Sequence, residues 1–356
     1  MAMNVNDFTN QITLKGVVSG YKITKQEAKM MWNDERNGLK IGDPITQYQG
    51  YVTVKTGDNQ FATVNVRKNQ SFYNEELDAT SQALEDMANE VVDTFGKVKD
   101  VSKTPAITIR GAKITDNYYV REQELHQSLN VDLGFGRIYV TEPVENPEFE
   151  NTLNIAALVK DVVAETDKDG DETGRAVVKV LVPYTYGSEK KGNQVTRAMQ
   201  MEFVAGVYED EEGEYDLGSD LLNYSNEVLD YSYILIAELN TYYLEDKPQV
   251  DENQPRRGFG KRAIVDTQRQ RKSEFLLTGL DMVKDGDAFP EEDMDEAVQA
   301  RKKDIAEKMK ADEEKEKEDT TKKGRGNFGS GRQTSQPAQQ TSTGATTGRR
   351  RERSFM

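Results

Sequence analysis

Cysteine is absent from the 356 residues, and histidine occurs once, as His126. The lack of cysteine excludes disulfides, cysteine-bound zinc, iron–sulfur clusters and thiol nucleophiles. The single histidine excludes metal sites built from several histidines. His126 lies in the polar run Val120–Ser128, where we expect an ordinary histidine on a helix surface. We therefore expect no metal and no other cofactor.

Long apolar runs are also missing. No segment approaches the roughly 20 apolar residues that a membrane helix needs. The start, Met1–Asp7, lacks the basic region and the apolar core of a signal peptide. We expect a cytoplasmic protein without a membrane partner, in the host cytoplasm if a phage encodes it.

Catalytic motifs are equally scarce, since there is no Walker loop and no serine nucleophile elbow. Two Gly-Phe-Gly triplets, at Gly134 and Gly258, are too short to form a phosphate-binding loop. The acidic run from Asp167 resembles a calcium loop, but its sixth and twelfth positions are Glu172 and Val178 instead of glycine and glutamate. This run is expected to be a hairpin turn, and the chain is expected not to be an enzyme.

Charge is plentiful and unbalanced. The formal net charge is −16, charged residues make up 31% of the chain, and the mean hydropathy is −0.80. This balance argues against non-specific binding of duplex DNA. Binding to nucleic acid depends on local patches, however, so the charge has to be interpreted region by region.

The clearest structural pattern is a hairpin over Tyr51–Arg67. Its apolar residues alternate with larger polar and aromatic ones, which indicates a half-buried antiparallel pair of strands. Val52, Val54, Ala62, Val64 and Val66 form the apolar face. The outer face combines aromatic residues with basic ones.

The first domain is expected to span residues 1–147. Around the hairpin we expect a strand at Gln11–Gly20, a polar excursion at Lys22–Lys40 and a helix at Asn74–Asp93, then strands at Thr104–Val120 and Arg137–Thr141. The buried stripe of the helix is predicted to contain Leu77, Leu84, Met87 and Val91, with Phe95 as a further candidate.

The second domain, residues 148–250, repeats this order of elements. Strands are expected at Leu153–Glu165, Arg175–Pro183 and Met199–Gly206, a helix at Asp216–Asp230 and a strand at Tyr231–Tyr243. Three strands, a helix and further strand are the order of an OB fold, a five-stranded Greek-key barrel. The fold class is thus mostly β with some α: two tandem OB-like barrels, or another mostly-β pair of domains.

Residues 251–319 are expected to form a basic connector, a strand at Ser273–Gly279 and a charged helix at Pro290–Met309. The charged run Asp312–Asp319 should be solvated or frayed. Residues 320–356 are rich in Gly, Gln, Ser and Thr and cannot bury enough apolar surface to offset their chain entropy. We expect this tail, with its basic tip, to be disordered.

Aromatic residues next to basic ones supply the functional hint. Single-stranded nucleic acid is held by base stacking on exposed rings and by Lys and Arg contacts to phosphates. The candidate residues are Tyr51, Lys55, Phe61, Arg67 and Lys68 in the first domain, Tyr184, Lys190 and Lys191 in the second, and Arg256, Arg257, Lys261 and Arg262 as an electrostatic arm. Alternatively, the rings belong to the core and rim of the barrels and the bases keep the strands soluble.

The order of elements, the aromatic and basic hairpin and the low-complexity tail resemble those of phage-type single-stranded DNA-binding or replication-accessory proteins with OB folds. The resemblance implies a non-enzymatic protein that coats exposed DNA, or RNA, in replication or recombination. It also implies a tail that meets replication or recombination proteins. The tip departs from the family pattern, because Arg349–Phe355 is basic where an acidic tip is usual. A virion structural or assembly protein that self-associates is the alternative.

Overall fold

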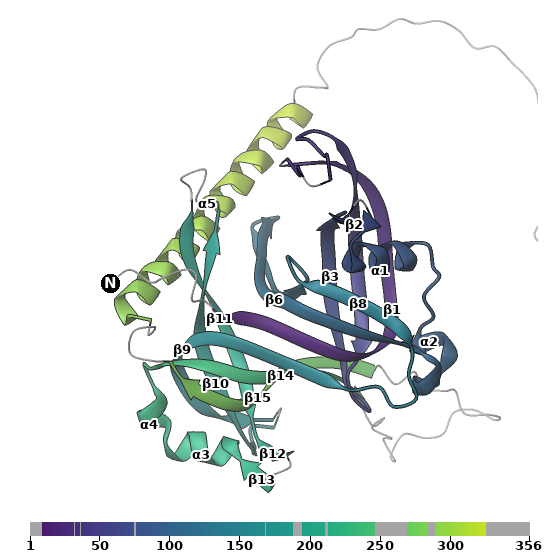
Figure 1. Cartoon of the computed structure of the whole chain (residues 1–356). Helices are drawn as coiled ribbons and strands as arrows, with labels where there is room; N and C mark the ends of the chain where they lie inside the picture. The colour runs from purple at the N-terminus through teal and green to yellow at the C-terminus, as the bar shows by residue number, and fades with distance from the viewer. Residues whose placement is uncertain are drawn as a thin grey trace, which may run out of the picture.

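The computed structural model describes residues 9–31, 33–35, 37–74, 76–167, 169–187, 194–210, 213–245, 269–283 and 289–324. The protein is mostly β, with a long C-terminal helix, as the sequence predicts (Figure 1). The strands fall into two halves, residues 10–143 and residues 150–282, that follow the same plan.

The first half is built on strands whose pairings close into a cycle. In chain order they are β1 (Asn10–Lys29), β2 (Pro44–Lys55), β3 (Phe61–Asn69), β6 (Pro105–Arg121), β7 (Glu124–Asp132) and β8 (Arg137–Pro143). Pairing runs from β1 to β2, β3, β7 and β6 and back to β1, with β8 alongside β6. Only β3 and β7 pair in parallel within this cycle, at Asn65 and Asp132.

Short elements connect β3 to β6. They are β4 (Phe72–Tyr73), β5 (Glu76–Leu77), α1 (Ala79–Ala88), α2 (Phe95–Val98) and the 3-10 turn η2 (Val101–Lys103). Asp78 caps α1, because its carboxylate accepts a 2.7 Å hydrogen bond from the Ser81 amide. The helix buries Leu84 and Met87 against the strands.

The second half closes in the same way. Its strands are β9 (Glu150–Thr166), β10 (Glu172–Tyr186), β11 (Val195–Ala205), β14 (Ser232–Glu245) and β15 (Arg269–Met282). Pairing runs from β9 to β10, β11, β15 and β14 and back to β9, and β11 and β15 pair in parallel. Between β11 and β14 lie β12 (Val207–Asp210), β13 (Gly213–Asp216), α3 (Leu217–Asn223) and α4 (Ser225–Val228).

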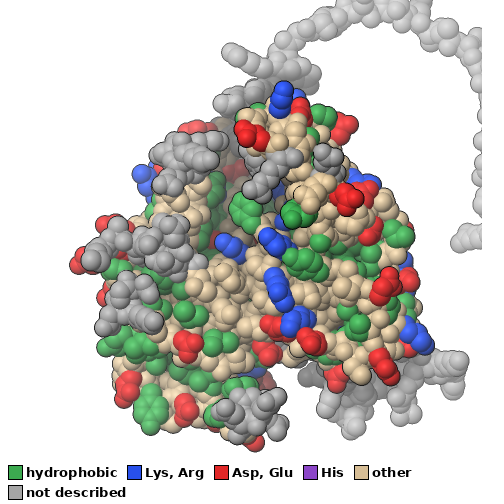
Figure 2. Space-filling model, viewed as in Figure 1, with side chains coloured by type: hydrophobic (Ala, Val, Ile, Leu, Met, Phe, Trp, Pro, Cys, Tyr) green, Lys and Arg blue, Asp and Glu red, His purple; other side chains and the backbone are tan. Residues whose placement is uncertain are grey.

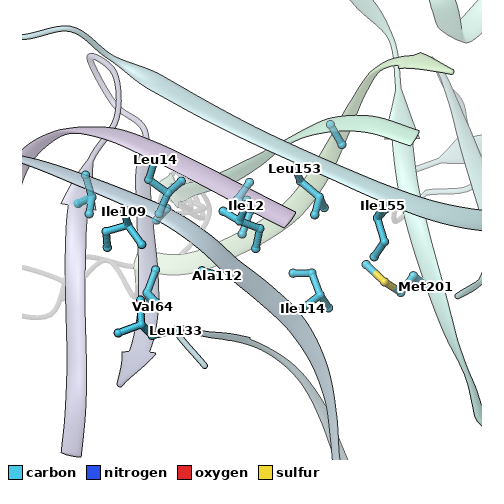
Figure 3. Packing of buried hydrophobic residues seen from close by; sticks show 14 of the residues in the cluster. Ile12, Leu14, Val64, Ile109, Ala112, Ile114, Leu133, Leu153, Ile155 and Met201 are labelled. Carbon is cyan, nitrogen blue, oxygen red and sulfur yellow. The ribbon is translucent and has the colours of Figure 1, made fainter. Parts of the chain in front are cut away.

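The two halves share one hydrophobic core. Antiparallel pairing of β1 with β9 joins them, from Asn10 opposite Ile155 to Lys15 opposite Glu150. Figure 3 shows Ile12 and Leu14 of β1 leading into Leu153 and Ile155 of β9, and all four side chains are fully buried. The predicted domain boundary at residue 147 falls between β8 and β9, and it remains a prediction.

The hairpin over Tyr51–Arg67 is confirmed, and its register places Val52 opposite Val64 and Lys55 opposite Phe61. Its apolar residues are buried as predicted. Glycine permits the close approach of β1 to β2. A Cβ at Gly50 would lie 1.7 Å from the Lys22 carbonyl oxygen, and one at Gly16 would lie 1.9 Å from that of Lys55.

Three predictions for the first half are wrong in detail. The excursion at Lys22–Lys40 begins as strand, because β1 continues to Lys29. The predicted helix at Asn74–Asp93 shortens to α1, and Val91 lies beyond it with 70% of its surface exposed. His126 lies on strand β7 rather than on a helix, with its ring stacked 5.0 Å from that of Tyr119.

The predicted helix at Asp216–Asp230 is divided into α3 and α4, which meet at Tyr224. The acidic run from Asp167 is a hairpin turn between β9 and β10, as expected. The strand at Ser273–Gly279 is confirmed within β15.

The helix α5 (Glu291–Gly324) confirms the predicted charged helix and extends it through the run that was expected to fray. It forms a long rod on one side of the molecule (Figure 1). It also includes the first five residues of the predicted tail, and the rest of that tail lies outside the described residues. No helix in the described part of the chain is both long enough and apolar enough to cross a membrane.

Candidate nucleic-acid interface

The outer side of strands β1, β2 and β3 presents a continuous polar and aromatic surface. Register places Lys22 opposite Tyr51, Thr53 opposite Thr63 and Gln49 opposite Arg67, so these side chains share one side of the sheet. We call this surface the β1–β3 face. Its residues are Lys22, Thr24, Gln26, Gln47, Gln49, Tyr51, Thr53, Phe61, Thr63, Asn65, Arg67 and Asn69.

The β1–β3 face includes no Asp or Glu among these residues, although the chain contains 63 of them. Tyr51 is 43% exposed, and Lys22 and Arg67 are exposed on either side of it in the strand order. Neither cation has a carboxylate within salt-bridge distance in the described structure. An exposed ring between two available cations is what stacking and phosphate binding need.

Neutral side chains on the same face are fixed by bonds to one another. The Gln26 amide donates to Gln47 at 2.5 Å, and the Gln47 amide donates to Asn69 at 2.6 Å. The hydroxyls of Thr53 and Thr63 are 3.0 Å apart across β2 and β3. These contacts link the strands and hold the face in a defined shape.

Lys55, although predicted as a phosphate contact, is only 4% exposed. Its ammonium donates to the carbonyl oxygens of Gly57 and Asp58, the latter at 2.7 Å. The rings of Phe61, Phe95 and Phe149 surround it, with centroids 5.6–5.8 Å from Nζ. Lys55 therefore holds the hairpin turn, and Phe61 is half-buried against it.

Lys68 points to the inner side of β3, opposite the buried Tyr48. Its ammonium donates to the Gly136 carbonyl at 2.7 Å. Burial lowers the pKa of this lysine, and the charge of Asp78 opposes that effect. Lys68 thus anchors the loop between β7 and β8, while the neighbouring Arg67 remains free to meet a ligand.

Lys22 was missed by sequence analysis because it falls in the stretch that was expected to be an excursion. A signal was present: Tyr21 and Ile23 alternate with Lys22 and Thr24, which is the period of a strand. Ile23 is indeed buried, and Lys22 is exposed.

The β1–β3 face also forms one wall of a groove between the halves. Thr63 and Asn65 line a cavity of about 470 Å³ whose other side includes Thr241 of β14 and Phe275 of β15. Glu274 of β15 also lines the second-half side of this cavity. The Arg175 guanidinium lies 3.1 Å from the Glu274 carboxylate and 2.7 Å from the Glu165 carboxylate. These carboxylates raise the pKa of the Arg175 guanidinium further. The single guanidinium thereby offsets part of the charge of the two carboxylates.

Tyr184, predicted as the stacking residue of the second half, contacts the first half instead. Its hydroxyl donates to Asp116 of β6 at 3.0 Å. Burial is the main cause that raises the pKa of this hydroxyl. Tyr184 is therefore part of the contact between the halves. Lys190, Lys191, Arg256, Arg257, Lys261 and Arg262 lie outside the described residues.

The corresponding outer face of the second half is covered by α5. Ala156 and Leu158 of β9, Leu181 of β10 and Ala198 of β11 pack there against the start of the helix. Phe289, just before α5, and Met294 and Ala297 within it complete this small core. In the described part of the chain, the β1–β3 face of the first half is not covered in this way by α5.

A family model described as YorF matches residues 8–312. The chain belongs to the YorF family. This match spans both halves and most of α5. A search of curated proteins finds no match. Within the described residues, no cluster of three or more His, Asp or Glu side chains could hold a metal ion.

Proposed function

We propose that both halves of this YorF-family chain are OB-type barrels. The support is the order of pairing. Numbering the main strands of each half from one to five, pairing runs 1-2-3-5-4-1 with strands 3 and 5 parallel. A helix lies between the third and fourth strands in both halves, as in the OB fold.

We further propose that the protein is a non-enzymatic binder of single-stranded DNA that coats exposed strands during replication or recombination. OB folds bind oligonucleotides on the face of their second and third strands. In the first half those strands are β2 and β3, which carry Tyr51 and Arg67. The acid-free β1–β3 face is the observation that carries this proposal.

A nucleic acid can bind a protein of net charge −16 only where a local positive patch outweighs the overall negative charge. Lys22 and Arg67 supply that local charge beside Tyr51. Bases stacked on the ring would add about 1–3 kcal/mol each without selecting a sequence. The phosphates of the bound strand would lie next to Lys22 and Arg67 and away from the acidic side chains of the second half.

Variants of the β1–β3 face test this function. The change Tyr51→Ala with Arg67→Gln should weaken binding of a fluorescently labelled dT oligomer roughly tenfold or more, because one stack and one phosphate contact are lost. Fluorescence anisotropy at low salt measures the affinity, and thermal melting checks that the variant is folded.

The matched control is Tyr224→Ala, which removes an exposed ring between α3 and α4, on the side of the second half away from β2 and β3 (Figure 1). It should bind as the wild type does. A folded Tyr51→Ala, Arg67→Gln variant with unchanged affinity would contradict the proposed site. If the wild type binds no single strand and instead polymerises, it is an assembly protein.

A further inference from the structure

A second exposed aromatic residue lies next to the β1–β3 face, in the loop that joins β7 to β8. Phe135 in this loop is 96% exposed. Full burial of a phenylalanine side chain is worth about 1.5–3 kcal/mol, so a ring left in water gains none of this stabilisation. Such a ring is available to a ligand.

The loop that carries Phe135 is held firmly. The Leu133 amide donates to the Asn65 carbonyl of β3 at 2.9 Å, and Lys68 binds the Gly136 carbonyl. Gly136 packs so tightly that a Cβ there would lie 2.8 Å from the Arg110 carbonyl oxygen. Gly134 adopts a left-handed conformation with φ of 51°, which favours glycine. The exposed ring is therefore presented by an anchored backbone.

Two arginines lie beside this loop. Arg110 of β6 and Arg137 of β8 are direct partners across the strands, and both are exposed. Like charges in this position destabilise a sheet. In the part of the chain that the structure describes, neither arginine has a carboxylate within salt-bridge distance; Arg137 contacts the Tyr139 hydroxyl at 3.4 Å. An anion between them would relieve the repulsion.

The negative charge of Asp78 contributes, from beyond salt-bridge distance, to raising the pKa of Arg137. The Asp78 carboxylate already accepts hydrogen bonds from Ser71 and Ser81. Figure 2 shows a column of Lys and Arg side chains down the middle of one face of the molecule, in the region of β6 and β8 in Figure 1. This concentration of positive charge stands out on a strongly acidic protein.

We propose that Phe135, Arg110 and Arg137 form a second contact site for the same single strand. Phe135 stacks on a base, and the arginine pair binds the adjacent phosphodiester, for which the guanidinium fork is well suited. This inference rests on the proposed function. The backbone bond from Leu133 to Asn65 and the pairing of Asn65 with Asp132 place the loop alongside the end of β3, so a strand leaving Tyr51 passes Arg67 and reaches Phe135.

Oligomer length separates the two sites. Phe135→Ala, and Arg110→Gln with Arg137→Gln, are titrated with labelled dT oligomers of increasing length. On the shortest oligomers that bind, both variants should match the wild type, because these occupy the β1–β3 face alone. On the longest, affinity should fall roughly tenfold for Phe135→Ala, which loses a stack. For the double arginine variant, the slope of log K against log salt concentration should become less steep by about 0.7 for each phosphate contact removed.

Arg121→Gln is the matched charge control, since Arg121 is exposed at the far end of the same strand β6 and pairs with Glu122. It should leave binding of every oligomer unchanged. If the Tyr51 and Arg67 variant is weakened while the Phe135 and arginine variants bind long oligomers like the wild type, the second site is wrong and the proposed function stands. If the wild type binds no oligomer, both fail.

Discussion

Asp116 is the residue at which the two halves and α5 meet. Its carboxylate accepts a hydrogen bond from Arg301 of α5 at 2.6 Å and one from Tyr184 of β10 at 3.0 Å. Its side chain is only 3% exposed. A buried carboxylate needs such partners, because water no longer solvates its charge.

Tyr118, two residues along β6, extends this network. Its hydroxyl donates to Asp304 at 2.7 Å and accepts from Arg197 at 2.8 Å. Burial, aided by the bond to Asp304, raises the pKa of Tyr118 to about 12. The hydroxyl therefore stays protonated and remains a donor across the ordinary pH range.

Removing the charge of Asp116 should loosen this contact. Asp116→Asn is expected to lower the free energy of unfolding by roughly 2–4 kcal/mol, because Arg301 is left without its counter-ion. Urea denaturation measures the change. The control is Asp161→Asn, which removes one member of an exposed pair with Lys179 and should cost less than about 1 kcal/mol. Equal costs for the two variants would show that the buried network does not stabilise the fold.

Residue roles were the part that sequence analysis predicted least well. Lys55 and Arg67 lie on the same face of one hairpin, yet Lys55 is covered by the ring of its cross-strand partner Phe61 and by two rings from distant segments. The sequence pattern gives the side of the strand, and only the packing of Phe95 and Phe149 decides which cation is accessible. Phe135 was visible as part of a Gly-Phe-Gly triplet, but its exposure depends on the contact of Gly136 with β6.

Among the elements, α5 contacts both halves along the part from Glu291 to Asp312. Glu291 binds Lys160 of β9 at 2.7 Å, and Lys308 lies 4.0 Å from the centre of the Tyr118 ring. Farther on, the Asp312 carboxylate accepts from the Gln123 amide at 3.1 Å. The sequence beyond that point is almost wholly charged or polar.

Amide hydrogen exchange should therefore divide α5 into two parts. Amides between Met294 and Lys308 should exchange slowly, because they open only when the packing on β9–β11 is lost. Protection should fall sharply between Asp312 and Gly324, since the sequence there has no apolar side chain and a polar helix is marginal in water. Mass spectrometry of exchanged peptides measures both segments. Uniform protection to Gly324 would mean that the last turns are packed against something.

Elements with strong periodicity were predictable, and those with mixed signals were not. The β2–β3 hairpin alternates without interruption, and both its position and its buried face were predicted. The continuation of β1 to Lys29 was missed because its residues beyond Ile23 are polar on both sides, which resembles a loop. The split between α3 and α4 at Tyr224 likewise has no Pro or Gly to mark it.

At the scale of the whole molecule, the repeated order of elements in the two halves could be predicted from the sequence, whereas the contacts that join the two halves could not. Pairing of β1 with β9 merges their cores, and α5 covers the outer face of the second half. Both depend on contacts between segments that are far apart in the chain, about 90 residues or more. This arrangement leaves the first half as the binding module in our account and gives the second half a supporting role.

The most direct test is a titration of the full chain with labelled dT oligomer at low and moderate salt, with a duplex of equal length as control. We predict binding of the single strand that weakens as salt rises, with a slope of about −0.7 for each phosphate contact, and much weaker binding of the duplex. Absence of single-strand binding at low salt, or equal affinity for the duplex, would contradict the account.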